Sequence, residues 1–299
     1  MPRWVIVLAG GQGRRVEHLT RGSDGRAVPK LYWDFGTGLS LLRHTLDRAE
    51  SVVPRERVVV VVDDGHRRWW GPALEGWPAG NVVVQGRDTG TALGLLGPLV
   101  RVALSAPRGV VLVLPSDHHV EREDVLRGSL VRALYEAGRS PDRVILLGMP
   151  PDAPDPEYGW IVPAARRTGR SGQASPSLEI ESFVEKPDRI EAERLMSRGA
   201  LWSSFIFAAT ANALVDVFRS VQPGLLRGYL ARARAADWDP AVPLDLVGLP
   251  ALDFSRDLLA HCTERLRILV VPPSGWTDLG APERVEAWPG RRRSVPLRV

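Results

Sequence analysis

The sequence predicts an α/β fold built on a doubly wound, mixed sheet. Six short apolar runs, rich in β-branched residues and bounded by glycine, proline or charge, lie at residues 4–9, 58–62, 82–84, 110–114, 144–147 and 266–271. Runs of this length and composition are typical of buried parallel strands. Helical patterns separate the early runs, and strands that alternate with helices indicate a doubly wound sheet.

Three segments between the early runs carry apolar residues at helical spacing, namely residues 39–50, 91–103 and 125–138. After Gly148 this alternation fades into a proline-rich stretch. Extended segments at 158–162 and 179–185 then flank a polar, glycine- and serine-containing segment, which predicts a hairpin tip at 166–177. We expect one domain over residues 1–287, with strands and helices added in the second half, and a loosely attached tail over 288–299.

Composition and charge exclude several classes of protein. The 299 residues are 44% hydrophobic, which suffices for one full core. The 39 basic and 35 acidic residues are interleaved apart from Arg291-Arg-Arg293, which argues against nucleic-acid binding. The apolar run at the start is too short for a signal peptide core or a membrane span, so we expect a cytoplasmic protein without membrane contacts.

Three residue types are scarce. The single cysteine, Cys262, excludes an internal disulfide, and we expect a buried, inert thiol within a helix. Only two of the 39 basic residues are lysines, Lys30 and Lys186, and Asn81 and Asn212 are the only asparagines. The chain has drifted away from lysine and asparagine, so the lysines that remain are candidates for a specific role.

A glycine-rich loop, Leu8-Ala-Gly-Gly-Gln-Gly-Arg-Arg15, directly follows the first predicted strand. Ligands of such sheets bind beyond the carboxyl ends of the strands. Glycines let backbone N–H groups approach a phosphate, and arginines can hold its oxygens. The spacing differs from the dinucleotide fingerprint because Val16 stands at the last glycine position, and Walker loops need Gly-Lys-Ser/Thr. A tight turn without a ligand is the alternative.

The order Gly10-Gly-Gln-Gly13, Arg15 and Pro29-Lys30 resembles the signature G-G-x-G-x-R…P-K of sugar-1-phosphate nucleotidyltransferases. Among these the chain most resembles the mannose-1-phosphate guanylyltransferases. The resemblance implies that Arg15 and Lys30 bind phosphates and offset charge as pyrophosphate leaves. It also implies nucleotide contacts at three loop glycines, Gly10, Gly11 and Gly13.

A second motif, Phe183-Val-Glu-Lys-Pro-Asp188, is similar to the family's F-V-E-K-P. The resemblance implies that Lys186 holds the phosphate of the sugar phosphate and that Glu185 accepts hydrogen bonds from sugar hydroxyls. The chain's only two lysines thus occupy both lysine positions of the family pattern, which chance explains poorly. A compact ammonium with three donors differs from the planar fork of arginine, so the two residue types are not interchangeable here.

Two aspartates follow apolar runs. Asp117 lies in Pro115-Ser-Asp-His-His119, and Asp278 lies in Gly275-Trp-Thr-Asp-Leu-Gly280. Mg²⁺ takes one or two carboxylates together with phosphate oxygens and water, so this pair predicts a magnesium site. Each aspartate alone could instead cap a helix or form a turn. The two motifs together resemble the guanylyltransferase motifs P-S-D-H and W-x-D-L-G, which implies guanine and a nucleotide contact at Ser116.

The adjacent histidines, His118 and His119, raise the question of a zinc site. The chain offers no further histidine or cysteine at ligand spacing, which argues against zinc. We expect both histidines to shape the backbone or to support the metal-binding side chains from behind.

The stretch Gln85-Gly-Arg-Asp-Thr-Gly-Thr-Ala92 resembles N-R-G-T-A-P-G of the guanylyltransferases, with Asp88 in place of asparagine and Leu93 in place of proline. The resemblance implies that three residues of this loop contact the purine: Gly90, Thr91 and Ala92. A strand-to-helix connection without any base contact is the alternative.

Two further stretches resemble the sugar-binding motifs of the family. Tyr158-Gly-Trp160 is similar to G-Y-G-Y, which implies a sugar contact at Gly159, and Glu157 is a departure. Leu201-Trp-Ser-Ser-Phe-Ile-Phe207 is similar to W-N-S-G/F-x-F, with Ser203 where asparagine is expected. Serine reaches less far than asparagine and lacks its amide, so the mannose assignment is the more open one. Asp253 is expected to support the site.

The resemblance runs from residue 5 to about residue 285 and implies a Rossmann-like nucleotidyltransferase (GT-A-like) fold. Its nucleotide-binding half would cover residues 1–148 and its sugar-phosphate half residues 149–287. The expected substrates are an NTP and a sugar-1-phosphate, whose oxygen attacks the α-phosphorus and expels pyrophosphate, with Mg²⁺ as cofactor. Another base or hexose, a catalytically silent nucleotide sensor and a dinucleotide-dependent oxidoreductase are the alternatives; the glycine spacing argues against the last. A homodimer is one assembly open to the chain.

Overall fold

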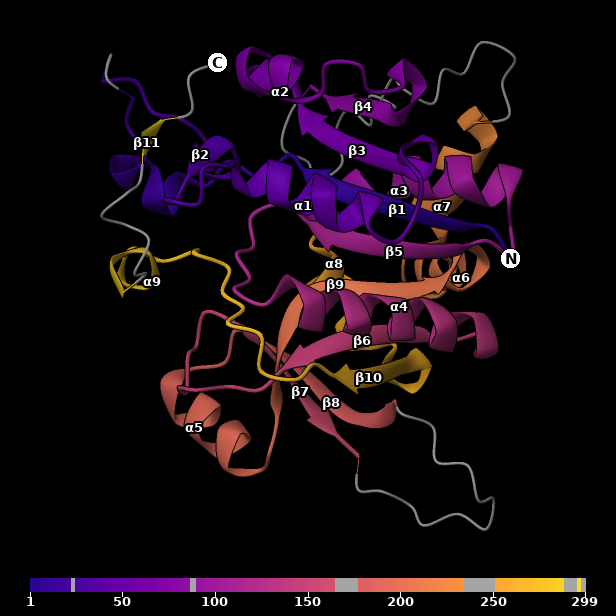
Figure 1. Ribbon diagram of the computed structural model, residues 1–299. Helices are drawn as coiled ribbons and strands as arrows, with labels where there is room; N and C mark the ends of the chain where they lie inside the picture. Colours follow the sequence, from indigo (N-terminus) through magenta and orange to yellow (C-terminus); the bar gives the residue numbers. More distant parts are fainter. Residues whose placement is uncertain (23–24, 87–89, 165–176, 234–250, 288–294, 297–299) are drawn as a thin grey trace.

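A nine-stranded mixed sheet forms the centre of the computed structural model (Figure 1). The structure describes residues 1–22, 25–86, 90–164, 177–233, 251–287 and 295–296. Across the sheet the strands follow the order β4 (Val82–Gln85), β3 (Val58–Asp63), β1 (Arg3–Ala9), β5 (Val110–Pro115), β9 (Leu201–Thr210), β6 (Val144–Met149), β10 (Leu266–Val270), β8 (Leu178–Glu185) and β7 (Gly159–Pro163).

The six apolar runs predicted as strands are all strands of this sheet. Strands β4, β3, β1 and β5 are parallel neighbours, and β6 and β10 form a second parallel pair. Strand β9 lies between these two groups and is antiparallel to both β5 and β6. The carboxyl ends of the six predicted strands therefore lie at one edge of the sheet, where the motifs fall.

The second half of the chain adds strands β7, β8 and β9, for which the spacing of apolar residues gave the weakest prediction. The first residues of β9 pair with β7, and its later residues pair with β5. Strand β7 also pairs with β8, so the strands β9, β6, β10, β8 and β7 close on one another. The sheet is continuous across both expected halves, and their boundary at residue 148 stays a prediction.

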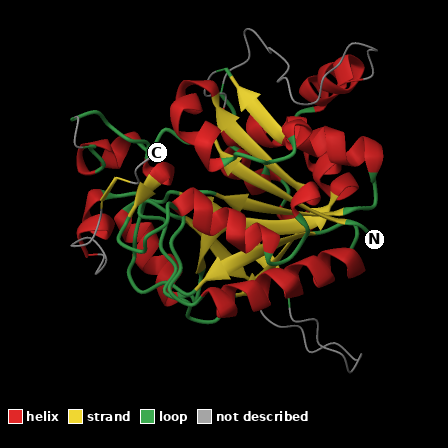
Figure 2. Cartoon of the chain, turned by 45° about the horizontal axis from the view of Figure 1, so that its top comes forward, coloured by secondary structure: helices red, strands yellow, loops and turns green. Residues whose placement is uncertain are grey.

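Helices cover both faces of the sheet, as Figure 2 shows. One core contains buried residues of α1 (Leu41–Glu50) and α4 (Glu123–Arg139), and the other contains those of α3 (Gly90–Ser105), α6 (Ala211–Val221) and α7 (Pro223–Ala233). Within β1, Val5 and Val7 belong to the first core and Ile6 to the second, as alternation along a strand requires. The predicted doubly wound α/β fold is confirmed.

The shorter helices are α2 (Arg67–Ala73), α5 (Arg189–Ser197), α8 (Phe254–Asp257) and α9 (Pro282–Ala287). Buried residues of α2 and α5 belong to the first core, and Phe254 of α8 belongs to the second. No helix among the described residues is both long and apolar enough to cross a membrane. The structure describes a single chain, so the homodimer stays a prediction.

Three local expectations need correction or lie outside the described residues. Cys262 lies between two 3₁₀ turns rather than within a helix; it is buried, and burial raises the pKa of its thiol to about 12, which keeps it inert. The predicted hairpin tip falls almost wholly on residues 165–176, outside the described ranges. Most of the tail that is expected to be loosely attached lies outside the described residues; within it, β11 (Val295–Pro296) pairs with β2 (Trp33–Asp34).

Candidate active site

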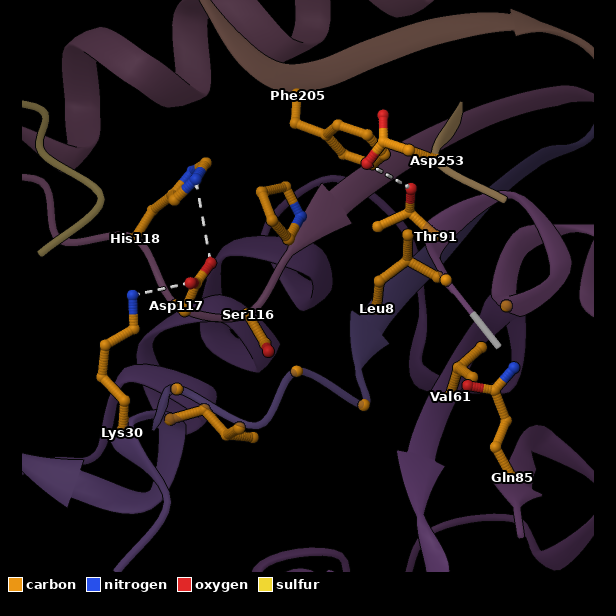
Figure 3. A pocket seen from close by; sticks show the side chains of 17 residues that line it. Leu8, Lys30, Val61, Gln85, Thr91, Ser116, Asp117, His118, Phe205 and Asp253 are labelled. Carbon is orange, nitrogen blue, oxygen red and sulfur yellow. Dashed lines mark hydrogen bonds and ion pairs between the residues drawn. The ribbon is translucent and has the colours of Figure 1, made fainter. Parts of the chain in front are cut away.

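Two adjoining cavities open at the carboxyl edge of the sheet. The larger holds about 440 Å³ and the smaller about 320 Å³. Both are lined by Gly13, Lys30 and Asp117, so they are parts of one cleft. Figure 3 shows the larger cavity with Lys30, Asp117 and His118 on one side and Thr91, Phe205 and Asp253 on another.

The glycine-rich loop forms the floor of the cleft, since Gly10, Gly11 and Gly13 all line the larger cavity. Gly13 has φ +61°, and a Cβ there would lie 2.8 Å from the Cβ of Lys30, so only glycine fits without strain. The loop is followed by a six-residue 3₁₀ helix, Arg14–Leu19, rather than by an α-helix. The loop therefore brings backbone to the cavity with little support from a helix dipole.

The side chain of Gln12 fixes this loop to the sheet. Its Nε2 donates a hydrogen bond to Oδ2 of Asp63 over 2.9 Å, and Asp63 ends strand β3. The other carboxylate oxygen of Asp63 accepts the N–H of Gly65. Sequence reasoning missed Asp63, although a lone carboxylate at the end of a fully apolar strand is a usable signal.

Lys30 joins the two predicted metal ligands. Its side chain is only 4% exposed, and its Nζ lies 2.6 Å from Oδ2 of Asp117 and donates to the backbone oxygen of Asp278 over 2.6 Å. Burial would raise the pKa of Asp117, but the ammonium of Lys30 outweighs it by charge and hydrogen bonding, so the pKa lies below its usual range. Two residues 161 positions apart in the sequence thus meet at one nitrogen.

His118 lies beside Asp117, and both residues line the larger cavity. Burial lowers the pKa of His118 to about 4, so the imidazole is neutral at pH 7. The indole N–H of Trp276 donates to its Nδ1 over 3.1 Å, and an indole nitrogen is only a donor, so the ring proton must lie on Nε2. Nε2 lies 3.8 Å from Oδ1 of Asp117. The neighbouring His119 is buried and pairs through its backbone with Thr277, which ties the two aspartate loops together.

Asp278 is held by donors from three segments. Its Oδ1 accepts the hydroxyl of Tyr158 over 3.0 Å and the N–H of Gly280 over 2.9 Å. Nε of Arg284 lies 2.8 Å from the same oxygen. Asp278 also lines the smaller cavity. Its carboxylate is thus fixed in orientation at the edge of the cleft.

Arg15, predicted to bind phosphate, lines the smaller cavity but forms an ion pair with Glu157. Both side chains are about half exposed, which makes this a weak interaction. The pair joins the glycine-rich loop to the segment before β7. Its acidic member, Glu157, is a position where the sequence departs from the family pattern. A phosphate that enters the smaller cavity can compete for Arg15.

Of the three residues predicted to contact the base, two line the larger cavity and the third is buried in the core. Gly90 and Thr91 line the larger cavity, and Gly90 has φ +82° with no room for a Cβ against the backbone of Leu252. The hydroxyl of Thr91 accepts the N–H of Phe254 over 2.8 Å. Ala92, however, is fully buried, and its N–H donates to the oxygen of Leu252.

Ala92 is therefore not brought to the cavity, because it begins the buried face of α3. Asp88, the departure within this loop, lies outside the described residues. Ser116 lines the larger cavity and is held by its N–H, which donates to the oxygen of Leu8.

Sequence reasoning missed several residues that line the larger cavity. Gln85 ends β4, and a Cβ placed on Gly10 or on Gly94 would lie 3.2–3.3 Å from its amide atoms. The amide therefore lies between the glycine-rich loop and α3, where it can both donate and accept hydrogen bonds. Asp253, expected as support, itself lines the cavity and receives the hydroxyl of Thr91 at 3.4 Å.

The predicted sugar-binding residues meet at the edge of the closed strands. Gly159 pairs with Glu185 across β7 and β8. A Cβ on Gly159 would lie 2.5 Å from Oε2 of Glu185 and 3.4 Å from Cβ of Ser203, so these three residues are in contact. Burial raises the pKa of Glu185 to about 7, and the charge of Asp253 adds to the effect. Asp253 thereby links the sugar-binding residues to the larger cavity.

Backbone strain concentrates at this site. Among the described residues, three that are not glycine have positive φ: Lys186 at 47°, Phe205 at 56° and Leu279 at 46°. Lys186 is a predicted catalytic residue, Phe205 lines the larger cavity, and Leu279 follows Asp278 directly. Such strain persists only where the surroundings enforce it, and it clusters at functional sites.

The two aspartates suit Mg²⁺ by the chemistry of their donors. Both line the smaller cavity and both contact Lys30, so they share one corner of the cleft. Hard carboxylate oxygens, with phosphate oxygens and water completing the shell, are what Mg²⁺ prefers. In the part of the chain that the structure describes, no group of three or more His, Cys, Asp or Glu side chains is arranged to hold a metal. The residues present therefore fit an ion that brings ligands with its substrate.

Known proteins resemble this chain along most of its length. The Xanthan biosynthesis protein XanB of Xanthomonas campestris pv. campestris is 26% identical over 92% of this chain and 57% of its own length. A mannose-1-phosphate guanylyltransferase of Klebsiella pneumoniae is 24% identical over 92% of this chain and 58% of its own length. The chain thus spans less than two thirds of these curated relatives.

A crystal structure of a mannose-1-phosphate geranyltransferase from Thermus thermophilus superposes with a TM-score of 0.77 at 28% identity, over 96% of this chain and 80% of that one. The family model described as nucleotidyl transferase matches residues 4–285, which include every predicted site residue. The chain belongs to the nucleotidyl transferase family.

Proposed function

We propose that the chain transfers a nucleotidyl group from GTP to mannose-1-phosphate, giving GDP-mannose and pyrophosphate. The observation that carries the proposal is a pair of chemically distinct groups of residues that Asp253 connects. Lys30, the glycine-rich loop and two carboxylates line the cleft and suit a metal-bound triphosphate. Gly159, Glu185 and Ser203 contact one another and suit a sugar, and Asp253, which lines the cleft, acts by charge on Glu185.

The reaction needs charge neutralisation and positioning more than proton transfer. A phosphate oxygen of the sugar phosphate forms a bond to the α-phosphorus of the nucleotide, and the bond from that phosphorus to the oxygen between the α- and β-phosphates breaks, so that oxygen leaves with pyrophosphate. The attacking phosphate is already ionised at pH 7, so no general base is required. Arg15, Lys30 and Lys186 supply fixed positive charge around the transferred group, which lowers the barrier most when it is preorganised.

Asp117 and Asp278 would hold Mg²⁺, which supplies positive charge to phosphate oxygens when it is bound. Lys30 lies against both residues, so it can pass from Asp117 to a phosphate over a short distance when the nucleotide enters. The exposed Lys186 is free to reach the sugar phosphate, and its strained backbone fixes the direction of its side chain.

The choice of guanine and mannose rests on the relatives and on two lining residues. Proteins of Klebsiella pneumoniae and Escherichia coli O157:H7 named as mannose-1-phosphate guanylyltransferases match over 92% and 94% of the chain. The amide of Gln85 can hydrogen-bond the edge of a base from the floor of the larger cavity, and Thr91 lines the same cavity. Both substrates are charged metabolites of the cytoplasm, so we place the reaction there.

Pyrophosphate release tests this proposal directly. The protein with Mg²⁺ is assayed with GTP, ATP, UTP and dTTP, each against mannose-1-phosphate and glucose-1-phosphate. Release with GTP and mannose-1-phosphate at least about tenfold faster than with any other pair is the expected result. Release with another pair keeps the chemistry and overturns the specificity. No release with any pair favours a nucleotide-sensing protein, which Asp88 and Ser203 motivate, and a nucleotide-binding measurement would then identify it.

A further inference from the structure

Arg284 holds a fixed positive charge beside the proposed metal site. It lies in α9, and its Nε and Nη2 lie 2.8 Å and 3.4 Å from the two carboxylate oxygens of Asp278. Its Nη1 forms an ion pair with Asp155, and its Cζ lies 4.5 Å from the ring centroid of Tyr158. The side chain is only 16% exposed. A guanidinium contacted on these sides has little freedom to move away.

Arg284 contacts Asp278 from outside the cleft. Asp278 lines the smaller cavity, whereas Arg284 lines neither of the two cavities described above. The guanidinium is therefore placed to act on the carboxylate and not on a substrate. The nucleotidyl transferase motifs W-x-D-L-G and P-S-D-H include no arginine of this kind, so the sequence patterns do not account for it.

The contact matters because a cation that already lies beside a carboxylate weakens the binding of a second cation to that carboxylate. Unit charges a few ångströms apart at a protein surface interact strongly enough to change an ion's affinity by about tenfold or more. Asp155 offsets part of the charge of Arg284, because the two carboxylates share one guanidinium. The other proposed ligand, Asp117, is likewise held against Lys30 at 2.6 Å. Both carboxylates thus face protein cations before any substrate is present.

We propose that Arg284 is a resident counter-cation of Asp278, which suppresses binding of a divalent ion to the free protein and makes that binding depend on the phosphates of the nucleotide. The inference rests on the proposed role of Asp278 as a metal ligand. A triphosphate carries enough negative charge to outweigh one guanidinium, so the ion binds tightly only together with the nucleotide. Arg284 is a positioning residue in this account, since it acts through Asp278.

Binding of Mn²⁺ to the full chain tests the proposal without any turnover. The free ion is measured by electron paramagnetic resonance, first with protein alone and then with a non-hydrolysable GTP analogue. The wild type should bind Mn²⁺ at least about tenfold more tightly with the analogue. Arg284→Gln should bind Mn²⁺ alone at least about fivefold more tightly than the wild type. Asp155→Asn should bind it more weakly, because the whole charge of Arg284 then falls on Asp278.

Three controls separate this role from a structural one. Arg284→Lys keeps the charge but loses the planar fork, so its affinity for Mn²⁺ should lie between those of the wild type and Arg284→Gln. Arg198→Gln removes a charge from an exposed pair with Glu181 and should leave Mn²⁺ binding unchanged. Adding Asp278→Asn to Arg284→Gln should abolish the gain, which would locate the ion at Asp278. Thermal unfolding of each variant verifies the fold.

The proposal predicts opposite changes in the affinity for Mn²⁺ in the two main variants, Arg284→Gln and Asp155→Asn. Weaker or unchanged Mn²⁺ binding in Arg284→Gln, or weakening in both variants alike, would overturn the proposal and leave Arg284 as a structural tie between α9 and Asp155. Pyrophosphate assays separate the two claims. A protein without transferase activity that still shows the opposite shifts refutes the proposed function alone, and an active enzyme without them refutes the counter-cation alone.

Discussion

Charge is arranged differently in the two parts of the candidate site, the cleft itself (the phosphate end) and the group of Gly159, Glu185, Lys186 and Ser203 (the sugar end). At the phosphate end each predicted catalytic cation faces a carboxylate, with Lys30 against Asp117 and Arg15 against Glu157. At the sugar end burial, with the charge of Asp253 as a smaller contribution, raises the pKa of Glu185 to about 7. The exposed Lys186 acts by charge on Glu185 but forms no salt bridge to any residue that the structure describes.

This difference indicates what each substrate must do. The phosphate end is nearly neutral before the nucleotide arrives, so the triphosphate has to take cations away from protein carboxylates. The sugar end carries a lysine without a salt bridge and a carboxyl group whose pKa is raised to about 7. We therefore expect this end to bind a phosphate through the lysine and to bind its substrate in a pH-dependent way. Changes at the sugar end should therefore affect turnover and pH dependence, and changes at the phosphate end should affect nucleotide binding.

The largest effect is expected at Lys186. Lys186→Met removes the one cation assigned to the sugar phosphate, and turnover should fall by about 10²–10³-fold, as for loss of a preorganised charge. The neighbouring Arg189→Met, also exposed, is the matched control and should change turnover by less than about twofold. Steady-state kinetics checks both variants. Near-normal turnover in Lys186→Met would remove Lys186 from the catalytic set.

A glycine pair tests the phosphate end. Gly13→Ala places a Cβ 2.8 Å from Lys30 at φ +61°, and it should lower the free energy of unfolding by about 1–2 kcal/mol and raise the KM for the nucleotide about tenfold. Gly11→Ala meets no atom within 4 Å, so its unfolding should match the wild type. Denaturant melts and nucleotide kinetics measure both. Equal stability of the two variants would contradict the assigned strain.

The pH dependence of sugar-phosphate binding tests the sugar end. Glu185 accepts hydrogen bonds best when ionised, and its pKa is raised to about 7, so the ionised form is present above that pH and is lost as the pH falls through it. The KM for the sugar phosphate should therefore fall about three- to tenfold from pH 6 to pH 8. Glu185→Gln should flatten this change, and Asp253→Asn should move its midpoint to lower pH. A profile that Glu185→Gln leaves intact assigns the titration to another group.

The smallest effect is expected at Glu157. Glu157→Gln releases Arg15 from an exposed ion pair, and such pairs contribute about 0–1 kcal/mol. The KM for the nucleotide should fall by about two- to threefold, and the difference from the wild type should vanish in high salt. Nucleotide kinetics at two ionic strengths measures this. A rise in KM would mean that Glu157 helps to place Arg15 for the phosphate.

Much of the fold followed from local patterns. The runs at β1, β3 and β5 are continuous and apolar because parallel strands are covered on both faces, so composition alone identified them. Strand β9 was harder because it is antiparallel and changes partners midway, from β7 to β5. The burial of Ala92 was not predicted for a related reason, since a loop pattern does not show where the buried face of α3 begins.

The site was predicted where a motif carries its own chemistry. Lys30 and Asp117 were named separately, and the structure places their charged atoms 2.6 Å apart. Gln85 and Arg284 were not named, because their places depend on tertiary contacts. Arg284 meets Asp155 across 129 positions of sequence, and no local pattern encodes such a pairing. Their roles, like those of all the site residues, stay proposals until they are measured.

One isotope experiment tests the central claim, that the oxygen of a sugar phosphate attacks a nucleotide in this cleft. Mannose-1-phosphate with ¹⁸O in its three non-bridging phosphate oxygens is incubated with GTP, Mg²⁺ and the protein. The masses of the products are then measured by mass spectrometry. The account predicts that GDP-mannose keeps all three labels and that pyrophosphate carries none. Label in pyrophosphate, or loss of label from GDP-mannose to water, would contradict it.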